Sequence, residues 1–265
     1  MTQDRTCEEW TKLVETVAKL RGPDGCPWDR QQTHESLRKY AIEETYEVVE
    51  AIETGDPVKI EDELGDMLLQ VLLHAQIASE CGQFDIAGVC KGIREKLQRR
   101  HPHVFADTQI SGVEDVLTNW DKIKHTEPGY EDRKSLLDGV PKSLPALMRA
   151  AKMSKKAAKT GFDWPDVHSI FGKIEEETDE LKEAIAGNDK AKVKEEIGDL
   201  LFTIVNVARH EEIDPEESLR AMLDKFRERF TQIEDHARQA GLSVSDLSLE
   251  EMDCIWNKAK AGNRQ

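Results

Sequence analysis

Four carboxylates occur twice along this chain, and their spacing is its most informative chemical feature. The first set comprises Glu44, Glu47, Glu63 and Asp66. The second set lies 133 residues later at every position (44 to 177, 47 to 180, 63 to 196, 66 to 199) and comprises Glu177, Glu180, Glu196 and Asp199. The flanking residues repeat as well, with ELGDMLL at 63–69 and EIGDLLF at 196–202. This regularity indicates a tandem duplication of one helical unit.

The carboxylates fall on the apolar faces of the helices expected to carry them. On a helical wheel Glu177 lies among apolar neighbours, namely Ile174, Leu181 and Ala184. A charge that faces a core without a partner costs on the order of several kcal/mol. Each acid therefore needs either a Lys or Arg partner or a bound cation. Because four acids converge in both copies, we expect metal binding rather than simple ion pairs.

The type of ligand narrows the choice of metal. Di-iron helical bundles place a His three residues after a Glu on two of their helices, and none of the eight histidines here has that spacing. An all-oxygen ligand set favours Mg²⁺, with Mn²⁺ as a substitute. Mg²⁺ usually keeps several waters and binds together with substrate phosphates. A nucleotide-type substrate is therefore indicated.

Basic and aromatic residues repeat together with the acids. Lys59 and Lys192 each lie four residues before an acid of the set. Pairs one helical turn apart also occur in both copies, namely Lys96 with Arg100, Lys225 with Arg229, Trp120 with Lys124, and Trp256 with Lys260. Lys and Arg can bind phosphate oxygens, and an indole can stack on a base. A solvated surface role is the alternative for each pair taken alone.

Helices must position all of these residues. Of the 265 residues, 34% are charged and 6% are aromatic, and apolar residues follow helical periods almost throughout. This pattern predicts an all-α fold. The expected helices span 7–21, 35–53, 58–81, 86–99 and 114–124, then 146–159, 167–186, 191–211, 215–240 and 249–259. The second half is expected to repeat the helix order of the first.

A segment rich in Pro, Gly and charged residues separates the two copies. We expect an N-terminal domain over 1–126, a linker over 127–145 and a C-terminal domain over 146–265, because such segments interrupt periodic structure. A helical unit of this size leaves its acid-bearing pair of helices half exposed. Dimerisation through the remaining apolar faces is therefore expected.

The composition argues against several classes of partner. A net charge of −16 disfavours binding to nucleic acid or to an anionic membrane. The longest apolar stretch, 67–78, is too short to span a bilayer, and the N-terminus lacks the apolar segment of a secretory signal. The five cysteines include no C-x-x-C pair and are typical of reduced thiols. A cytoplasmic protein is predicted.

The motifs together resemble the MazG family. They are EExxE followed by ExGDML or ExGDLL, once in each copy, with GCPWD at 25–29, RRHPHVF at 99–105 and GFDW at 161–164. The resemblance covers about residues 13–260. It implies a homodimeric helical bundle that hydrolyses NTPs and dNTPs to the monophosphate and pyrophosphate with Mg²⁺. It also implies broad base tolerance and a role in removing abnormal nucleotides.

The same resemblance implies a role for each matching residue. The metal ligands and catalytic acids would be Glu177, Glu180, Glu196 and Asp199, with Glu44, Glu47, Glu63 and Asp66 as equivalent ligands. The nucleotide contacts would be Lys173, Lys192, Lys225, Arg229, Trp256 and Lys260, with Lys59, Lys96, Arg100, Trp120 and Lys124 as N-terminal equivalents. The C-terminal copy is generally credited with hydrolysis in two-domain members. Tyr40 stands where Lys173 would be in the first copy, which favours the second copy as the NTP site.

The mechanism and the type of activity both remain open. Water could attack either the α or the β phosphorus, since both routes give the same products, and either copy or both could be active. A relative that prefers one dNTP or phosphoribosyl-ATP is a second enzymatic interpretation. Two non-enzymatic interpretations are a nucleotide- or alarmone-binding regulator without turnover, and a helical scaffold whose acids only form ion pairs.

Overall fold

The computed structural model describes residues 2–127 and 134–262. These residues form helices, turns and bends without a strand, which confirms the all-α prediction. The chain divides into two compact units, Met1–Glu131 and Asp132–Gln265, and the division falls inside the segment expected to be a linker. Among the described residues no helix combines the length and the apolarity needed to cross a membrane.

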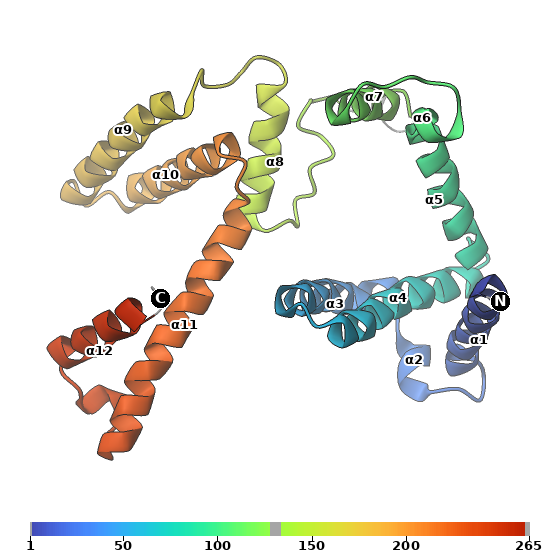
Figure 1. Cartoon of the computed structure of the whole chain (residues 1–265), viewed down its shortest axis with the longest axis horizontal. Helices are drawn as coiled ribbons and strands as arrows, with labels where there is room; N and C mark the ends of the chain where they lie inside the picture. Colours follow the sequence, from blue (N-terminus) through green and yellow to red (C-terminus); the bar gives the residue numbers. More distant parts are fainter. Residues whose placement is uncertain (1, 128–133, 263–265) are drawn as a thin grey trace. The chain divides into compact units, whose positions relative to one another are not determined.

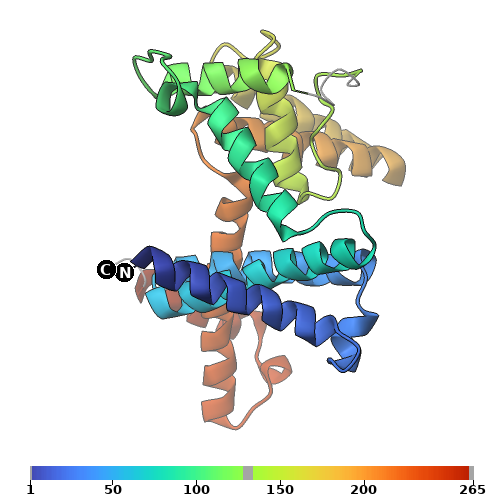
Figure 2. The same ribbon diagram turned by 90° about the vertical axis from the view of Figure 1, so that its right-hand side faces the viewer.

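The first unit is built around a hairpin of two long helices. Its elements in chain order are α1 (Thr2–Arg21), α2 (Pro27–Gln31), α3 (His34–Thr54), α4 (Pro57–Glu80), α5 (Ile86–Arg100), α6 (Pro102–Phe105) and α7 (Val113–His125). Helices α3 and α4 lie side by side and α1 packs along α4, as Figures 1 and 2 show. Helix α5 leads from the end of α4 to α6 and α7 (Figure 1).

Local sequence sets the ends of the α3–α4 hairpin. The Thr33 hydroxyl accepts from the backbone N–H of Ser36 and forms a capping box at the start of α3, which satisfies donors that a helix start leaves unpaired. Gly55 ends α3 in the left-handed conformation with φ 67°, where glycine is favoured. Asp56 then caps α4, whose first residue is Pro57. The short turn makes α3 and α4 antiparallel.

The core of the first unit lies between α1, α3 and α4. Its buried apolar residues are Val17, Leu37, Leu72, Leu73 and Ile77, with Trp10, Leu13, Val14, Tyr40, Leu68, Leu69 and Ile86 packed around them. Burial of apolar surface contributes roughly 25 cal/mol per Å². The helices that carry the first set of acids are therefore fixed by the apolar residues on their other faces.

The second unit contains a matching hairpin. Its elements are α8 (Ala146–Ala158), α9 (Val167–Ala186), α10 (Lys190–His210), α11 (Pro215–Ala240), the 3-10 helix η1 (Val244–Asp246) and α12 (Leu249–Gly262). Asp166 caps α9 and Asp189 caps α10. Helices α9 and α10 pack against one another, and α8 packs on α10 (Figure 1).

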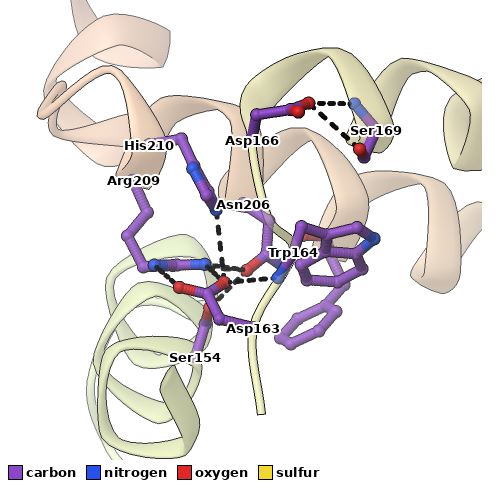
Figure 3. A network of polar contacts seen from close by, with 9 residues as sticks. Ser154, Asp163, Trp164, Asp166, Ser169, Asn206, Arg209 and His210 are labelled. Carbon is purple, nitrogen blue, oxygen red and sulfur yellow. Dashed lines mark hydrogen bonds and ion pairs between the residues drawn. The ribbon is translucent and has the colours of Figure 1, made fainter. Parts of the chain in front are cut away.

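A polar network joins the turn before α9 to the end of α10 (Figure 3). The guanidinium of Arg209 donates to both carboxylate oxygens of Asp163 and to the side-chain oxygen of Asn206. Nε2 of His210 lies 3.2 Å from Asp163, and the Ser154 hydroxyl of α8 donates to Asn206, which is fully buried. Buried polar groups need such partners, so this network holds α8, α9 and α10 together.

The two units differ outside their hairpins, contrary to the expectation of a repeated helix order. Helix α5 ends at Arg100 because Pro102 cannot continue the helical hydrogen bonding, and the short helix α6 follows. The matching helix α11 runs unbroken for 26 residues. Helices α2 and α6 and the 3-10 helix η1 were not predicted either, since each is too short to produce a periodic pattern.

Candidate metal and nucleotide site

Three carboxylates converge in each hairpin. In the first unit Glu44 of α3 meets Glu63 and Asp66 of α4, and one ligand oxygen from each lies within 4.8 Å of the other two. The second unit brings together its own three acids, Glu177, Glu196 and Asp199, within the same limit. The E-x-x-D spacing places two acids one turn apart on α4 or α10. The other helix of the hairpin, α3 or α9, supplies the third acid.

The fourth acid of each set lies beside this group rather than in it. Glu47 lies close enough to Glu44 and Glu63 to raise the pKa of both carboxyls. Glu180 likewise raises the pKa of Glu196. Each unit therefore gathers four carboxylates, of which three lie close enough together for one ion.

Burial within the two groups is uneven. Glu177 and Glu196 are each only 4% exposed, whereas Glu44 and Glu63 are half-buried. The helical wheel placed all of these acids on core-facing surfaces, and this was wrong for Glu47, Asp66 and Asp199, which are exposed.

The shared environment raises the pKa of several of these acids. Burial raises the pKa of Glu44, with a further rise from the neighbouring carboxylates of Glu47 and Asp66. Burial followed by the charge of a neighbouring glutamate also raises the pKa of Glu63 and of Glu196. Carboxylates that repel one another in a partly dry site stabilise a bound cation, so the electrostatics favour metal binding.

In the second unit two lysines contact the acids. Nζ of Lys173 lies 2.7 Å from Glu177 and 2.9 Å from Glu176, and Nζ of Lys192 lies 3.9 Å from Glu196. The two glutamates raise the pKa of Lys173. In this unit lysines therefore already contact two of the acids, and these contacts would compete with a cation for the same carboxylates.

The first unit lacks both of these contacts. Tyr40 occupies the position of Lys173, and among the described residues no lysine or arginine lies within ion-pair distance of Glu44 or Glu63. The predicted equivalent Lys59 is exposed on α4. A buried amide, Gln70, instead donates from Nε2 to Oε1 of Glu44 at 3.4 Å.

The predicted nucleotide contacts of the second unit lie on α11 and α12. The guanidinium carbon of Arg229 lies 5.4 Å from the centroid of the Trp256 ring, and Phe226 packs against the same ring at 5.3 Å between centroids. Nε of Arg229 is buried without a hydrogen-bond partner in the described structure. Lys225 and Lys260 are exposed. The result is a cationic and aromatic surface on this pair of helices.

The equivalent arginine and tryptophan of the first unit form the same stack, but a carboxylate of the chain itself already binds the arginine. The guanidinium carbon of Arg100 lies 5.0 Å from the centroid of the Trp120 ring. Glu127 accepts hydrogen bonds from both Arg99 and Arg100. These bonds, with that to Arg100 the stronger influence, lower the pKa of Glu127 to about 2. Lys96 is exposed and Lys124 is half-buried.

In each unit the tryptophan of the Arg–Trp stack lies on a helix that does not contact the acid-bearing hairpin in the part of the chain that the structure describes. Among the described residues α12 packs against α11 and not against α9 or α10, and α7 packs against α5 and not against α3 or α4. The structure therefore brings together the acids with Lys173 and Lys192, and separately Arg229 with Trp256. It does not join the two sets into one pocket within a unit.

Several relevant residues were missed in the sequence. Gln70 lies one turn after Asp66 in an otherwise apolar stretch, so a polar residue at that spacing was the available signal. Glu127 lies just after α7, and no spacing rule linked it to Arg100. The Arg209–Asp163 pair was also missed because its members are 46 residues apart.

The oxygen ligands fit a hard divalent cation. Mg²⁺ and Mn²⁺ prefer carboxylate and water oxygens, and both groups supply only carboxylates from residues that the structure describes. Glu44, Glu63 and Asp66, or Glu177, Glu196 and Asp199, would hold the ion. No His or Cys from the described part of the chain joins either group, which argues against a zinc-type ligand set.

The sequence matches the MazG nucleotide pyrophosphohydrolase domain over residues 32–105 and 166–233. The chain belongs to the MazG family. Both matched segments contain all four acids of their copy, whereas Trp120, Lys124, Trp256 and Lys260 lie outside them. The tandem duplication of a MazG unit predicted from the spacing is confirmed.

Full-length relatives agree with this MazG assignment. The nucleoside triphosphate pyrophosphohydrolase/pyrophosphatase MazG of Thermotoga maritima is 45% identical over 95% of this chain and 96% of its own length. The nucleoside triphosphate pyrophosphohydrolase of Escherichia coli K12 is 42% identical over 94% of this chain and 96% of its own. YabN of Bacillus subtilis is 51% identical over 97% of this chain, which spans about half (53%) of that protein.

Proposed function

We propose that this chain hydrolyses nucleoside and deoxynucleoside triphosphates to the monophosphate and pyrophosphate in an Mg²⁺-dependent reaction. We further propose broad base tolerance and a role in clearing abnormal nucleotides from the cytoplasm. Membership of the MazG family and the names of the full-length relatives support the reaction. The free cysteines are in keeping with a reducing compartment.

One observation carries the proposal. Three carboxylates converge within 4.8 Å in each of two hairpins, and two of them, Glu177 and Glu196, are almost fully buried. Such a concentration of negative charge on packed helices is costly unless a cation binds there. When bound, Mg²⁺ supplies charge neutralisation at the phosphates and a more acidic water.

The chain's own residues would act as follows. Glu177, Glu196 and Asp199 hold the ion, while Glu180 is placed to orient a water or accept its proton. Lys173 and Lys192 can exchange their glutamate partners for phosphate oxygens, because an ammonium binds either anion. Arg229 and Trp256 offer a guanidinium and an indole to the remaining phosphate and base.

The second unit is the better candidate for NTP turnover. It carries lysines beside its acids, and the buried Nε of its Arg229 has no partner in the described structure. In the first unit Tyr40 replaces one lysine, and Glu127 already binds the equivalent Arg100. The first unit would have to release this carboxylate before a phosphate could take its place.

We also propose a homodimer. Trp256 of the Arg–Trp stack lies on α12, which among the described residues packs against neither α9 nor α10, so a second copy would complete a site that uses both the stack and the acids. Helix α11 also exposes an apolar stripe, which comprises Leu219, Met222, Leu223, Phe226 and Phe230. Stripes of this kind are commonly buried in an interface between helical bundles.

Product analysis by ion-exchange chromatography tests the proposed reaction. The purified chain is incubated with each NTP and dNTP in Mg²⁺ or EDTA, beside Glu63→Gln and Glu196→Gln, which keep side-chain volume. We expect monophosphate and pyrophosphate, lost in EDTA and in Glu196→Gln. Loss in Glu63→Gln alone would assign turnover to the first unit.

Different products would overturn the proposal. Nucleoside diphosphate with phosphate would mean a different phosphohydrolase. Tight nucleotide binding without any product would favour a regulator. Turnover confined to a single dNTP would exclude broad base tolerance and leave the reaction type standing.

A further inference from the structure

The two acid groups differ in how their charge is balanced within the chain. In the second unit Lys173 and Lys192 contact Glu177 and Glu196. In the first unit no lysine or arginine among the described residues lies within ion-pair distance of Glu44, Glu63 or Asp66. The acids of the first group therefore have no ammonium partner among the described residues, whereas two acids of the second group each have one.

Gln70 adds an independent observation at the first group. Its side chain is about nine-tenths buried, with 8% exposed, and its Nε2 donates to Oε1 of Glu44 at 3.4 Å. The other end of the amide, Oε1, is buried without a hydrogen-bond partner in the described structure. A buried amide oxygen beside carboxylates cannot be satisfied by them, because they are acceptors too. It requires a donor or a cation.

The corresponding position of the second unit is Thr203. Its hydroxyl donates to the backbone carbonyl of Asp199 at 2.9 Å, so its donor is already satisfied within the helix. The second group thus has two ammonium groups and no free amide oxygen, whereas the first has a free amide oxygen and, among the described residues, no ammonium. Both differences should make the first group bind a cation more strongly than the second group does.

We propose that the first acid group is a standing divalent-cation site in which Gln70 is a positioning residue. This site binds Mg²⁺ or Mn²⁺ in the absence of nucleotide. The amide holds Glu44 through Nε2 and offers Oε1 to a metal-bound water. The second group binds the ion strongly only together with a nucleotide, whose phosphates draw Lys173 and Lys192 away from the acids. This last part rests on the proposed function.

Charge and ligand chemistry support this division. A lysine within about 4 Å of a carboxylate opposes a divalent cation at that carboxylate. An amide oxygen is an acceptable partner for a hard ion or its waters, and groups that orient a ligand typically affect metal affinity by about 10- to 100-fold. The first group would then hold a cation whether or not the chain turns over a nucleotide.

Calorimetric titration of the full chain with Mn²⁺, without nucleotide, tests the proposal. Asp66→Asn and Asp199→Asn form a matched pair, since both residues are exposed and occupy equivalent positions. We expect one stronger site that is lost in Asp66→Asn and kept in Asp199→Asn. Loss of the stronger site in Asp199→Asn, or equal effects of the two changes, would overturn the proposal.

A second pair of variants isolates the amide. Gln70→Leu removes both polar ends at similar volume, and Thr203→Val is its counterpart in the second unit. We expect Gln70→Leu to weaken the stronger site about tenfold or more, and Thr203→Val to leave it unchanged. An unchanged affinity in Gln70→Leu, in protein whose helical circular dichroism is intact, would show that Gln70 is only a packing residue.

A third variant tests the role of the lysine in the second unit, and its result does not require the Gln70 variant to fold. Lys173→Tyr copies the residue found at Tyr40 and removes the ammonium from Glu177. We expect it to strengthen Mn²⁺ binding at the second group about tenfold without nucleotide, and no change would overturn the role of the lysine. Because these titrations contain no nucleotide, they succeed or fail independently of hydrolysis.

Discussion

Glu196 is held almost entirely out of solvent beside Glu180, and the pKa of its carboxyl is raised first by burial and then by that neighbouring charge. A folded-state pKa above the ordinary value means that folding is opposed when the group is ionised. This penalty is present at neutral pH and disappears as the pH falls below the ordinary pKa. This proposed metal ligand therefore destabilises the fold when no cation is bound.

Glu196→Gln should accordingly raise the Tm of the second unit by a few degrees in EDTA at neutral pH, although it lowers turnover. The gain should shrink toward pH 4, where the wild-type carboxyl is protonated as well. Differential scanning calorimetry at both pH values measures the effect. Glu195→Gln, at an exposed neighbouring position, is the control and should change little. A lower Tm for Glu196→Gln in EDTA would contradict the argument.

The pKa of Glu127 is shifted in the opposite direction, so this carboxylate stabilises the fold when it is ionised. Its pKa is lowered to about 2 by Arg100 and Arg99, so its stabilising effect is complete above the ordinary carboxyl pKa of 4.5 and is lost as the pH falls toward 2. We expect Glu127→Gln to lower hydrogen-exchange protection in α7 about tenfold at pH 7. The difference from wild type should diminish below pH 4.5.

The matched control for Glu127 is Glu35→Gln. Glu35 also pairs with an arginine, Arg38, but both side chains are more than 70% exposed, and exposed pairs contribute little. Equal loss of protection in the two variants would mean that the Arg–Glu127 cluster does not anchor α7.

For individual residues, the sequence predicted which acids come together in each copy. The acids stood out because identical spacing in two copies is visible without a structure. Three features were not predictable, namely the exposure of Asp66, the hydrogen bond from Gln70 to Glu44, and the ion pair between Glu127 and Arg100. Each depends on how two helices face one another, which a periodicity along one helix does not contain.

Helices α8, α9 and α10 are joined by polar contacts in addition to buried apolar residues such as Ile170 and Val205. Arg209 at the end of α10 binds Asp163 in the turn before α9, and the side chains are only 15% and 27% exposed. Arg209 is the first cause of the lowered pKa of Asp163, with His210 also contributing. This contact fixes the start of the helix that carries Glu177 and Glu180.

Asp163→Asn should destabilise the second unit by about 2 kcal/mol, because it leaves a half-buried guanidinium without its carboxylate. Urea unfolding followed by circular dichroism measures the change. The effect should be full above the ordinary Asp pKa and decline as the pH falls, since the folded-state pKa is lowered. Asp179→Asn, whose partner Lys182 is 70% exposed, should cost less than about 0.5 kcal/mol. Similar losses in both would contradict this role.

The long helices were predictable because their apolar residues repeat over many turns, and α9 and α11 have the bounds expected from the sequence. The structure added single-turn elements such as α6, which begins at Pro102. A segment of four residues has too few positions to show a period. The break after Arg100 was visible in His101-Pro102, but the short helix beyond it was not.

Over the whole chain, the apolar stripe on α11 predicts self-association. Leu223 is 58% exposed within that stripe, and a carboxylate there would be buried at an interface without a partner. Leu223→Glu should therefore shift the protein from dimer to monomer in light scattering coupled to size-exclusion chromatography. Gln232→Glu, an exposed residue on the opposite face of α11, is the control. A monomeric wild type would refute the dimer.

Glu127 also determines how the chain would respond to mechanical load. It lies two residues after the end of α7, and its carboxylate binds Arg99 and Arg100 at the end of α5. A pulling force applied to the backbone beyond Glu127 would reach Arg99 and Arg100 directly. Helix α7 would be spared from unwinding until both ion pairs ruptured. The carboxylate would thus transmit such a force to α5 before it reached α7.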